Sequence, residues 1–489
     1  MKYYSTRNAE KKYTAAQAIA KGLADDGGLF VPETIPLISM DEIKSFCGMD
    51  YRGRALAIML KYLDEFSKEE LEGYVNSAYG DNYDDDRIAP LHFTNDATAY
   101  LELWHGPTCA FKDMALQMLP HLLTASLKKT GEEKKVCILV ATSGDTGKAA
   151  LEGFKDVQGT RIFVFYPKDG VSDIQRLQMV TQEGGNVGVC SVTGNFDDAQ
   201  TGVKKIFSDL QFAKELEGRG FFLSSANSIN WGRLLPQVVY YFSAYCDYVN
   251  SRKLELGEEL VFCVPTGNFG NILAGWYAKQ MGLPIGKFVC ASNENNVLTD
   301  FFATGVYNKN RPFHTTISPS MDILVSSNLE RMLHAYCGDA TVAELMGKLN
   351  SEGIYEVPSD TLGKISRDFT GGVCSDEQTK IEIKAVLNKS SYLIDTHTAV
   401  ASKVLSDYRE ETGDNRPAVV VSTASPYKFA GDVVSALGGN EKADALTELN
   451  RLSGTKTPKP LLGLGKRQVR FSENVESGDM KQAVDKFLR

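Results

Sequence analysis

Residues 136–150 read VCILVATSGDTGKAA: an apolar run is followed directly by a glycine-rich polar loop and then by helix formers. An apolar run without polar alternation is typical of a strand buried on both faces of a parallel sheet. The same order recurs at three later polar loops, SSANSINWGR (224–233), TGNFGN (266–271) and STASPYK (422–428). We therefore predict an α/β protein of open, mostly parallel sheets flanked by helices, with these loops at the edge where ligands bind.

Further apolar runs extend this pattern along the chain. We expect strands also in RIFVFYP (161–167), NVGVCSV (186–192), KFVCASN (287–293) and SYLID (391–395). Helices are expected within 111–129, 197–216 and 234–250. The pattern indicates three units, namely a mostly helical N-terminal unit at 1–95, a small α/β domain at 96–240, and a large α/β domain at 241–489 with an insertion at about 283–388 and a C-terminal extension.

The composition is that of an ordinary globular protein, since 43% of the 489 residues are hydrophobic and 24% are charged. The net charge of −9 is spread without a basic block, which argues against nucleic acid or an anionic membrane as the main partner. No run approaches the roughly 20 apolar residues of a membrane span, and the N-terminus lacks the apolar core of a signal peptide, so we expect a cytoplasmic protein. Nine cysteines without a Cys-x-x-Cys pair and six histidines without metal-ligand spacing predict reduced thiols and no catalytic metal.

The loop at 142–148 ends in Gly-Lys, like the phosphate loop of a nucleotide-binding protein. That loop requires a glycine five positions before Gly147 and a serine or threonine directly after Lys148. This sequence has Thr142 and Ala149 at those two positions. The glycine that lets the backbone wrap a phosphate and the hydroxyl that binds magnesium are both missing, which argues against a nucleotide site.

Two other loops carry candidate chemistry. GPTCAFKDMALQ (106–117) places Lys112 near a predicted helix start, where a lysine is commonly a surface residue. In an apolar setting such a lysine can instead lose its proton, form a Schiff base with a carbonyl and act as a base. PTGNFGN (265–271) lies between a predicted strand and a predicted helix. It is either a plain turn or a site where backbone N–H groups and a helix N-terminus bind a phosphate.

Together, GPTCAFKD, SGDTG, PTGNFGN and STASPYKF resemble the motifs of the threonine synthase family, pyridoxal-phosphate enzymes of the tryptophan synthase β-like fold (fold type II). The resemblance covers nearly the whole chain, because GLADDGGLFVP (22–32) is similar to the family's N-terminal segment and SPSMDILVSSNLERML (318–333) to its insertion. The lysine motif is shared with dehydratases and sulfhydrylases of this fold, whereas NSINWGR and SPSMDILVSSN are far more specific to threonine synthases. The length resembles the longer fungal and bacterial branch of the family.

The resemblance implies a role for each matching residue. Lys112 would form the Schiff base with pyridoxal 5'-phosphate, and Thr423 would meet the pyridine nitrogen. The cofactor's phosphate would lie in the loop of Gly267, Asn268, Phe269, Gly270 and Asn271. The substrate's carboxylate would bind at the loop of Ser143, Gly144, Asp145 and Thr146, in which the role of Asp145 is left open. The substrate's phosphate would bind at Asn227, Ser228 and Arg233, unless Arg233 forms a structural salt bridge.

The implied reaction converts O-phospho-L-homoserine and water to L-threonine and phosphate, the last step of threonine biosynthesis. The expected partner is this small-molecule substrate, and the expected assembly is a monomer or a weak homodimer. The alternatives are a serine or threonine dehydratase of the same fold, a related phospholyase that makes no threonine, and a cofactor-binding protein without catalysis. In DTHTAV (395–400), Thr396 stands where the family more often has proline, which leaves the geometry of the turn before His397 open.

Overall fold

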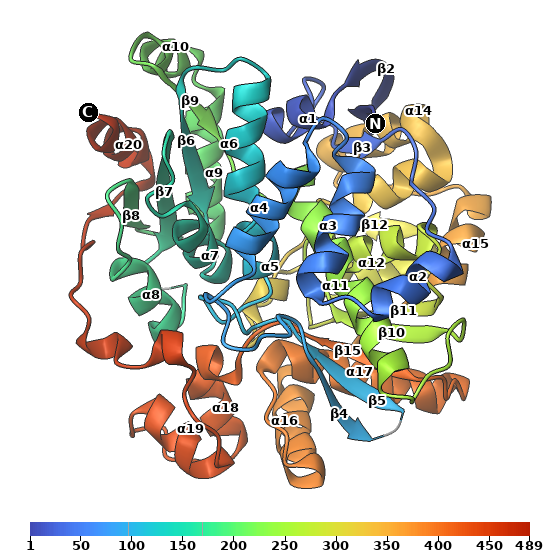
Figure 1. Cartoon of the computed structure of the whole chain (residues 1–489). Coiled ribbons are helices and arrows are strands. Elements are labelled where there is room, and N and C mark those ends of the chain that lie inside the picture. Colours follow the sequence, from blue (N-terminus) through green and yellow to red (C-terminus); the bar gives the residue numbers. More distant parts are fainter. Residues whose placement is uncertain (96, 169) are drawn as a thin grey trace.

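The computed structural model describes residues 1–95, 97–168 and 170–489, and its framework is two parallel sheets with helices on their faces (Figure 1). In the first sheet the strand order is β16-β8-β7-β6-β9, and every neighbouring pair is parallel. Its strands are β6 (Lys135–Ala141), β7 (Thr160–Pro167), β8 (Val187–Val192), β9 (Phe221–Ser224) and β16 (Asn474–Val475). Four of the expected strands therefore lie side by side in one sheet.

The second sheet has the order β14-β11-β10-β15-β5-β4. Its strands are parallel except β4, which pairs antiparallel with β5 at one edge. The strands are β4 (Leu91–Asn95), β5 (Thr98–Glu102), β10 (Leu260–Pro265), β11 (Ile285–Ser292), β14 (Phe369–Val373) and β15 (Ala418–Ser422). The expectation of open, mostly parallel sheets is confirmed.

Alternate residues of the central strands enter different cores, because successive side chains of a strand point to opposite faces. In β10, Phe262 and Val264 belong to the core that includes α11 (Trp231–Asn250) and α12 (Gly270–Gln280). The intervening Val261 and Cys263 belong to the core that includes α17 (Thr396–Thr412). Both faces of the strand are therefore apolar, which is why its sequence shows no polar alternation.

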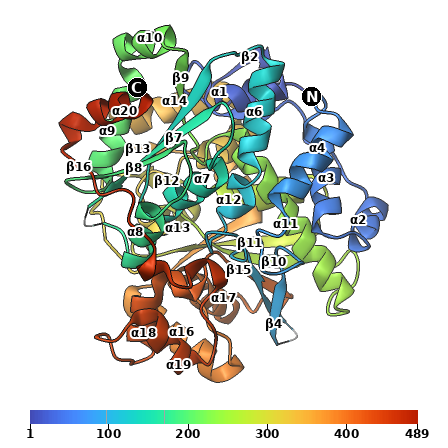
Figure 2. The same cartoon turned by 60° about the vertical axis from the view of Figure 1, so that its left-hand side comes forward.

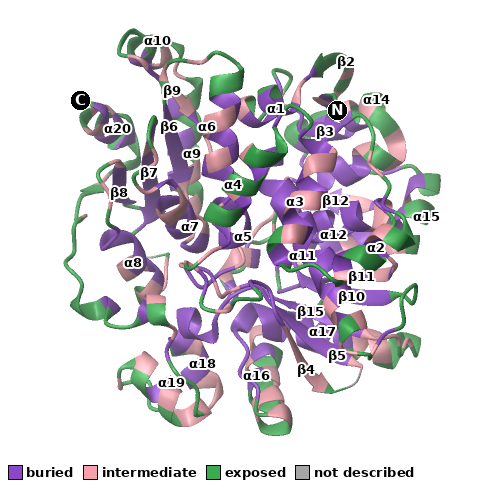
Figure 3. Ribbon diagram, viewed as in Figure 1, coloured by how far each residue is buried: buried purple, intermediate pink, exposed green. Residues whose placement is uncertain are grey.

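The first sheet is covered in the same way. Ile138 of β6 packs into the core that includes α6 (Leu119–Lys129) and α7 (Asp145–Phe154), whereas Leu139 packs into the core that includes α9 (Phe196–Ser208) and α20 (Met480–Leu488). Figure 3 shows the central strands of both sheets and α11 in the colour of buried residues. The cysteines take part in this packing: all nine are free thiols and seven of them are buried, as the sequence predicts.

The N-terminal unit packs on α11 through α2 and α3. Besides helices it contains a small antiparallel sheet with the order β2-β1-β3. Its elements are β1 (Tyr3–Ser5), β2 (Asn8–Tyr13), α1 (Ala15–Lys21), β3 (Phe30–Pro32), α2 (Met40–Cys47), α3 (Tyr51–Tyr62) and α4 (Lys68–Ala78). Side chains of Thr14, Ser39, Asp50 and Ser67 each accept a hydrogen bond from a backbone N–H in the first turn of a helix, which fixes where the four helices begin.

Three sequence-based elements differ from the structure. SYLID (391–395) is not a strand but the short buried connection between α16 (Asp376–Ser390) and α17, ended by the Asp395 side chain that caps α17. The helix expected within 111–129 is two helices, α5 (Asp113–Leu116) and α6. Pro120 lies in the first turn of α6, where a backbone N–H would have no partner within the helix, so its missing N–H costs nothing there. The helix expected within 197–216 is also two, α9 and α10 (Leu210–Gly218), separated at Asp209.

The remaining elements surround the second sheet or connect the two sheets. They are α8 (Asp173–Val180), α13 (Val297–Thr304), β12 (Val306–Asn308), α14 (Leu329–Ser351), β13 (Ile354–Glu356), α15 (Ser359–Asp368), α18 (Ala430–Ala436) and α19 (Ala445–Ser453). No helix in the described residues is both long and apolar enough to cross a membrane.

The division into units at 95 and 240 stays a prediction, because the sheets do not draw their strands from those ranges alone. Strand β5 belongs to the second sheet, while β16 and α20, near the end of the chain, lie on the first (Figure 2). The range expected as an insertion, about 283–388, contains β11 and β14, which are both strands of the second sheet. The polar segment after α19 connects α19 to β16, which pairs with β8 of the first sheet.

Candidate active site

A cavity of about 720 Å³ lies where the loops after β6, β9, β10 and β15 meet. The carboxyl ends of parallel strands share one edge of a sheet, so loops that are far apart in the sequence come together there. Of the expected site residues, all but Gly144 and Asp145 line this cavity: Lys112, Ser143, Thr146, Asn227, Ser228, Arg233, Gly267, Asn268, Phe269, Gly270, Asn271 and Thr423.

Lys112 is held in the cavity wall by the loop after β15. The backbone N–H of Phe111 donates to the carbonyl of Thr423 at 2.8 Å, and that of Ser425 donates to the carbonyl of Cys109 at 3.0 Å. The Lys112 side chain is only 12% exposed, and its Nζ lies 3.4 Å from Ser320 Oγ. Lys112 is therefore not a surface lysine.

Burial and nearby charges bring the pKa of Lys112 closer to neutral pH. Burial lowers the pKa of Lys112 to about 8, since desolvation penalises the ammonium form. Asp145, with Oδ2 at 3.9 Å from Nζ, opposes this change, whereas Arg233 and Lys428 add to it. A lysine with a pKa near neutral pH can both accept and return a proton.

The loop 267–271 has a strained and closely packed backbone. Phe269 adopts the left-handed conformation with φ of 62° and directly precedes α12. A Cβ at Gly267 would lie 2.6 Å from the carbonyl oxygen of Ser320, so only glycine fits there. Asn271 receives hydrogen bonds on Oδ1 from Tyr240 and Tyr241, but its buried Nδ2 has no partner among the described residues. The start of α12 therefore offers unpaired N–H donors to an anion.

The loop after β6 is shaped by Thr142, whose Oγ1 accepts the backbone N–H groups of Gly144 and Gly147, each at 2.9 Å. Gly144 has φ of 132°, and a Cβ there would lie 2.4 Å from the Gln175 side chain. Thr142, which stands where a phosphate loop has glycine, therefore holds the turn together through its hydroxyl. Ser143 and Thr146 of this turn line the cavity.

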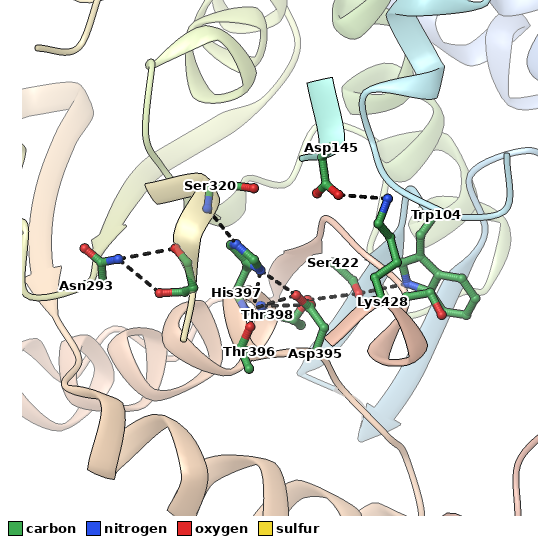
Figure 4. Close-up of polar contacts among 12 residues, drawn as sticks. Trp104, Asp145, Asn293, Ser320, Asp395, Thr396, His397, Thr398, Ser422 and Lys428 are labelled. Carbon is green, nitrogen blue, oxygen red and sulfur yellow. Dashed lines mark hydrogen bonds and ion pairs between the residues drawn. The ribbon is translucent and has the colours of Figure 1, made fainter. Parts of the chain in front are cut away.

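Asp145 turns away from the cavity to a buried lysine. Its Oδ1 lies 2.8 Å from Nζ of Lys428 and accepts a hydrogen bond from Gln175 Nε2 at 2.9 Å (Figure 4). Burial opposes ionisation of this carboxyl, but Lys428 and Lys112 outweigh it and hold the pKa of Asp145 well below its usual range. Asp145 is therefore a carboxylate.

Arg233 is a buried cation without a carboxylate partner in the described part of the chain. Its side chain is almost fully buried, Nη1 donates to the carbonyl of Ala226 at 2.7 Å, and Nε has no partner among the described residues. Burial lowers the pKa of Arg233 to about 10, so the guanidinium remains charged at neutral pH. The structural salt bridge considered from the sequence does not occur among these residues.

Sequence reasoning selected neither Ser320 nor His397 as a site residue, although both line the cavity. The backbone N–H of Ser320 donates to His397 Nε2 at 3.2 Å, and His397 Nδ1 lies 2.8 Å from Asp395 Oδ2 (Figure 4). Because Nε2 accepts, Nδ1 carries the proton and donates to Asp395. Asp395 also accepts the N–H groups of His397 and Thr398, so the turn forms without the proline at Thr396. The motifs SPSMDIL and DTHTAV were visible signals for these two residues.

Comparisons with known proteins identify the class of this fold and site. The family model described as "Pyridoxal-phosphate dependent enzyme" matches residues 95–424. The models described as "Threonine synthase N terminus" and "Threonine synthase, C-terminal" match residues 2–79 and 398–484. The two sheets and the lysine in their shared cavity are therefore those of a fold type II enzyme, whose cofactor is pyridoxal phosphate.

Full-length relatives narrow the class to one family. Threonine synthase of Saccharomyces cerevisiae is 36% identical over 99% of this chain and 98% of its own. The crystal structure of PLP-bound threonine synthase from Brucella melitensis matches with a TM-score of 0.89 and 37% identity, covering 100% of both chains. "Threonine synthase-like 1" of Homo sapiens is 40% identical over 98% of this chain and 67% of its own. The chain belongs to the threonine synthase family.

Proposed function

We propose that this protein converts O-phospho-L-homoserine and water to L-threonine and inorganic phosphate. The observation that carries the proposal is Arg233, a buried guanidinium without a carboxylate partner among the described residues, in the same cavity as Lys112. A dehydratase substrate has no phosphate and would give this cation nothing to bind. A substrate with its own phosphate supplies the missing anion.

The residues present fit pyridoxal phosphate. The N-terminus of α12, with the unpaired Nδ2 of Asn271, would bind the cofactor's phosphate, along the loop of Gly267, Asn268, Phe269 and Gly270. Lys112 would attach the cofactor through its amine, and the Thr423 hydroxyl, on the same wall, would meet the pyridine nitrogen. A neutral hydroxyl does not strongly favour a protonated ring nitrogen, unlike a carboxylate.

The two ends of the substrate would bind at different loops. Ser143 and Thr146, at the start of α7, would bind the α-carboxylate with N–H and hydroxyl donors, and Gly144, whose N–H donates to Thr142, would form the turn between them. Arg233, with Asn227 and Ser228 beside it, would bind the γ-phosphate. Holding both ends fixes the Cα and Cβ hydrogens of the substrate relative to Lys112.

When bound, pyridoxal phosphate supplies an aldehyde and a ring that stabilises negative charge at the substrate carbons next to it. Lys112 would take the proton from Cα, give it up so that the amine is neutral again, and then take one from Cβ, after which the γ-phosphate leaves with the electrons of its C–O bond. Water adds at Cβ, and Lys112 returns protons to the neighbouring carbons. A pKa of about 8 suits an amine that must act in both directions.

A phospholyase is the second candidate, because Lys112 and the buried guanidinium of Arg233 in one cavity would also suit a reaction that releases phosphate without making threonine. It would use the same cavity but release 2-oxobutyrate, ammonia and phosphate in place of threonine and phosphate. The two reactions consume the same substrate and one water, so phosphate release alone does not separate them.

The deciding experiment incubates the purified enzyme, loaded with pyridoxal phosphate, with O-phospho-L-homoserine, and measures threonine, 2-oxobutyrate and phosphate together. Threonine in an amount equal to phosphate is the expected result. Equal 2-oxobutyrate and phosphate would establish the phospholyase, and turnover of L-serine or L-threonine without phosphohomoserine turnover would establish a dehydratase. We further propose that the protein is cytoplasmic and is a monomer or a weak homodimer. Light scattering, which measures the mass in solution, tests the oligomeric state.

A further inference from the structure

Lys428 is buried completely and lies in the short helical turn Pro426–Phe429 after β15. Among the described residues its Nζ makes two polar contacts, to the carbonyl oxygen of Thr108 at 2.9 Å and to Oδ1 of Asp145 at 2.8 Å. Removing a lysine from water completely is costly unless a carboxylate and hydrogen bonds compensate it. This lysine therefore has a specific partner, which comes from the loop that faces the substrate.

Asp145 lies between two lysines. Its Oδ1 contacts Lys428, whereas its Oδ2 is 3.9 Å from Nζ of Lys112. The distances differ enough that the carboxylate forms its short ion pair with Lys428 and only a loose one with Lys112. The three groups come from different elements: the beginning of α5, the beginning of α7 and the turn after β15.

We propose that Lys428 is a positioning residue, which binds the Asp145 carboxylate so that Asp145 does not form a tight ion pair with Lys112. Without Lys428, the nearest cation to Asp145 would be Lys112, and a tight pair would keep that amine protonated and turned from the substrate. The effect of Lys428 on the rate of threonine formation rests on the proposed function, whereas its effect on the protonation of Lys112 does not.

The surrounding charges support this role. Arg233 faces Lys112 from α11 and also disfavours its ammonium form. Asp113 faces Lys428, but it is engaged by the N–H and hydroxyl of Thr108 at 2.8 and 2.7 Å. Lys148, a buried lysine of α7, is paired with Glu152 at 2.8 Å. Among these groups Asp145 is the carboxylate that can reach both lysines.

The test uses the holoenzyme and three variants, Lys428→Met, Asp145→Asn and the double variant. The visible absorption band of bound pyridoxal phosphate is titrated against pH without substrate. The midpoint of this titration reports protonation of the nitrogen through which Lys112 is attached to the cofactor. Lys428→Met removes a positive charge near Lys112 and frees Asp145, so the midpoint of the titration should rise by roughly one pH unit. Asp145→Asn removes the opposing negative charge, so the midpoint should fall by roughly one unit. The double variant should return to within about half a unit of the parent protein.

The matched control is Lys148→Met, which also removes a buried lysine of an ion pair but not one that contacts Asp145. It should leave the midpoint unchanged. A merely structural role for Lys428 would lower the melting temperature without moving the midpoint, and that outcome overturns the proposal. If Lys428→Met does not fold, Asp145→Asn alone decides: no fall of the midpoint contradicts the role of the pair.

The kinetic readout is kept separate from the spectroscopic one. If the parent enzyme makes threonine, Lys428→Met should lower kcat at pH 7 by roughly tenfold and change KM for phosphohomoserine less than twofold, because substrate contacts are intact. A shifted midpoint in an enzyme that makes no threonine would reject the proposed function and retain the role of Lys428. Threonine formation with unshifted midpoints would retain the proposed function and reject the role of Lys428.

Discussion

The backbone N–H of Ser320 donates a hydrogen bond of 3.2 Å to Nε2 of His397, and the Oγ of the same serine lies 3.4 Å from Nζ of Lys112. His397 is in turn held by Asp395, which also caps α17. The segment 318–322 is thus fixed to a rigid helix on one side and borders the active-site lysine on the other.

His397→Ala should loosen that segment. It leaves the Ser320 N–H without a partner and removes the ring contact to Asp395 Oδ2, which keeps only the backbone N–H of residue 397, so we expect a loss of about 1–3 kcal/mol in the free energy of unfolding. Hydrogen exchange at the Ser320 amide should accelerate more than in the strands of the second sheet. His92→Ala, which removes a ring stacked on Tyr392 away from the cavity, is the control. Unchanged exchange at Ser320 would contradict the assigned hydrogen bond.

Lys112→Ala should abolish the visible absorption band of the attached cofactor and reduce phosphate release by on the order of 1,000-fold or more, because it removes both the attachment and the base. Absorption spectra and a phosphate assay measure the two effects. Lys155→Ala, at the end of α7 and paired with Glu183 on the surface, should change neither. A variant at Lys112 that kept both properties would show that another amine does this work.

Arg233→Ala should weaken substrate binding without loss of cofactor. A charge-assisted, bidentate contact to phosphate contributes several kcal/mol when buried, so we expect KM for phosphohomoserine to rise by roughly 100-fold. The ratio of bound pyridoxal phosphate to protein should stay near that of the parent enzyme. Loss of cofactor, with KM unchanged, would move Arg233 to the cofactor's phosphate.

Gly267→Ala should weaken cofactor binding by roughly tenfold or more. Its new Cβ would meet the Ser320 carbonyl at 2.6 Å, so the loop 267–271 must shift from the N-terminus of α12. Equilibrium dialysis of pyridoxal phosphate measures the affinity. Gly347→Ala, in α14 with nothing within 4 Å of its added Cβ, is the matched control. That variant should bind the cofactor normally and be about 0.5–1 kcal/mol more stable, since alanine favours helix.

His105 should make stability fall at alkaline pH. Burial would lower its pKa, but hydrogen bonds to Asp84 and Glu102, at 2.6 and 2.8 Å, raise the pKa to about 9. Because this value lies above that of the unfolded chain, near 6.5, the stabilisation is complete below about pH 6.5 and is lost as pH rises through about 9. Relative to His105→Gln, the parent protein should be more stable by about 1–3 kcal/mol at pH 6 and equal at pH 10. Urea unfolding at several pH values tests this.

Much of the fold could be predicted because its signals are local. The runs at 136–141, 260–265 and 418–421 are apolar at every position, and each becomes part of a central strand buried on both faces. The same signal failed at 391–395, because a short buried connection between two helices is as apolar as a buried strand and differs only in its hydrogen-bond partners. The helix break at Asp209 depends on a side-chain cap, and the one before Pro120 on a proline in the first turn, and a purely apolar pattern shows neither.

The site could be predicted as a set of loops, because every loop follows a parallel strand and such loops converge. Lys112 and the loops around Gly144, Asn227 and Gly267 were each found by motif. Ser320 and His397 were not selected, because neither has a partner at a diagnostic sequence spacing. Their contact joins a loop before α14 to the first turn of α17, and only the folded chain brings the two together.

The sheet type, the candidate lysine and the four polar loops follow from the amino-acid sequence alone, since apolarity, glycine and helix-start signals act within a few residues. The tertiary structure decided what Asp145 does. The sequence SGDTG does not show which group Asp145 interacts with, because the interaction energy of a carboxylate depends on which cations lie within a few ångströms in a low-dielectric interior. The fold places Lys428 at 2.8 Å and Lys112 at 3.9 Å, and that difference makes Asp145 the partner of one lysine and only a neighbour of the other.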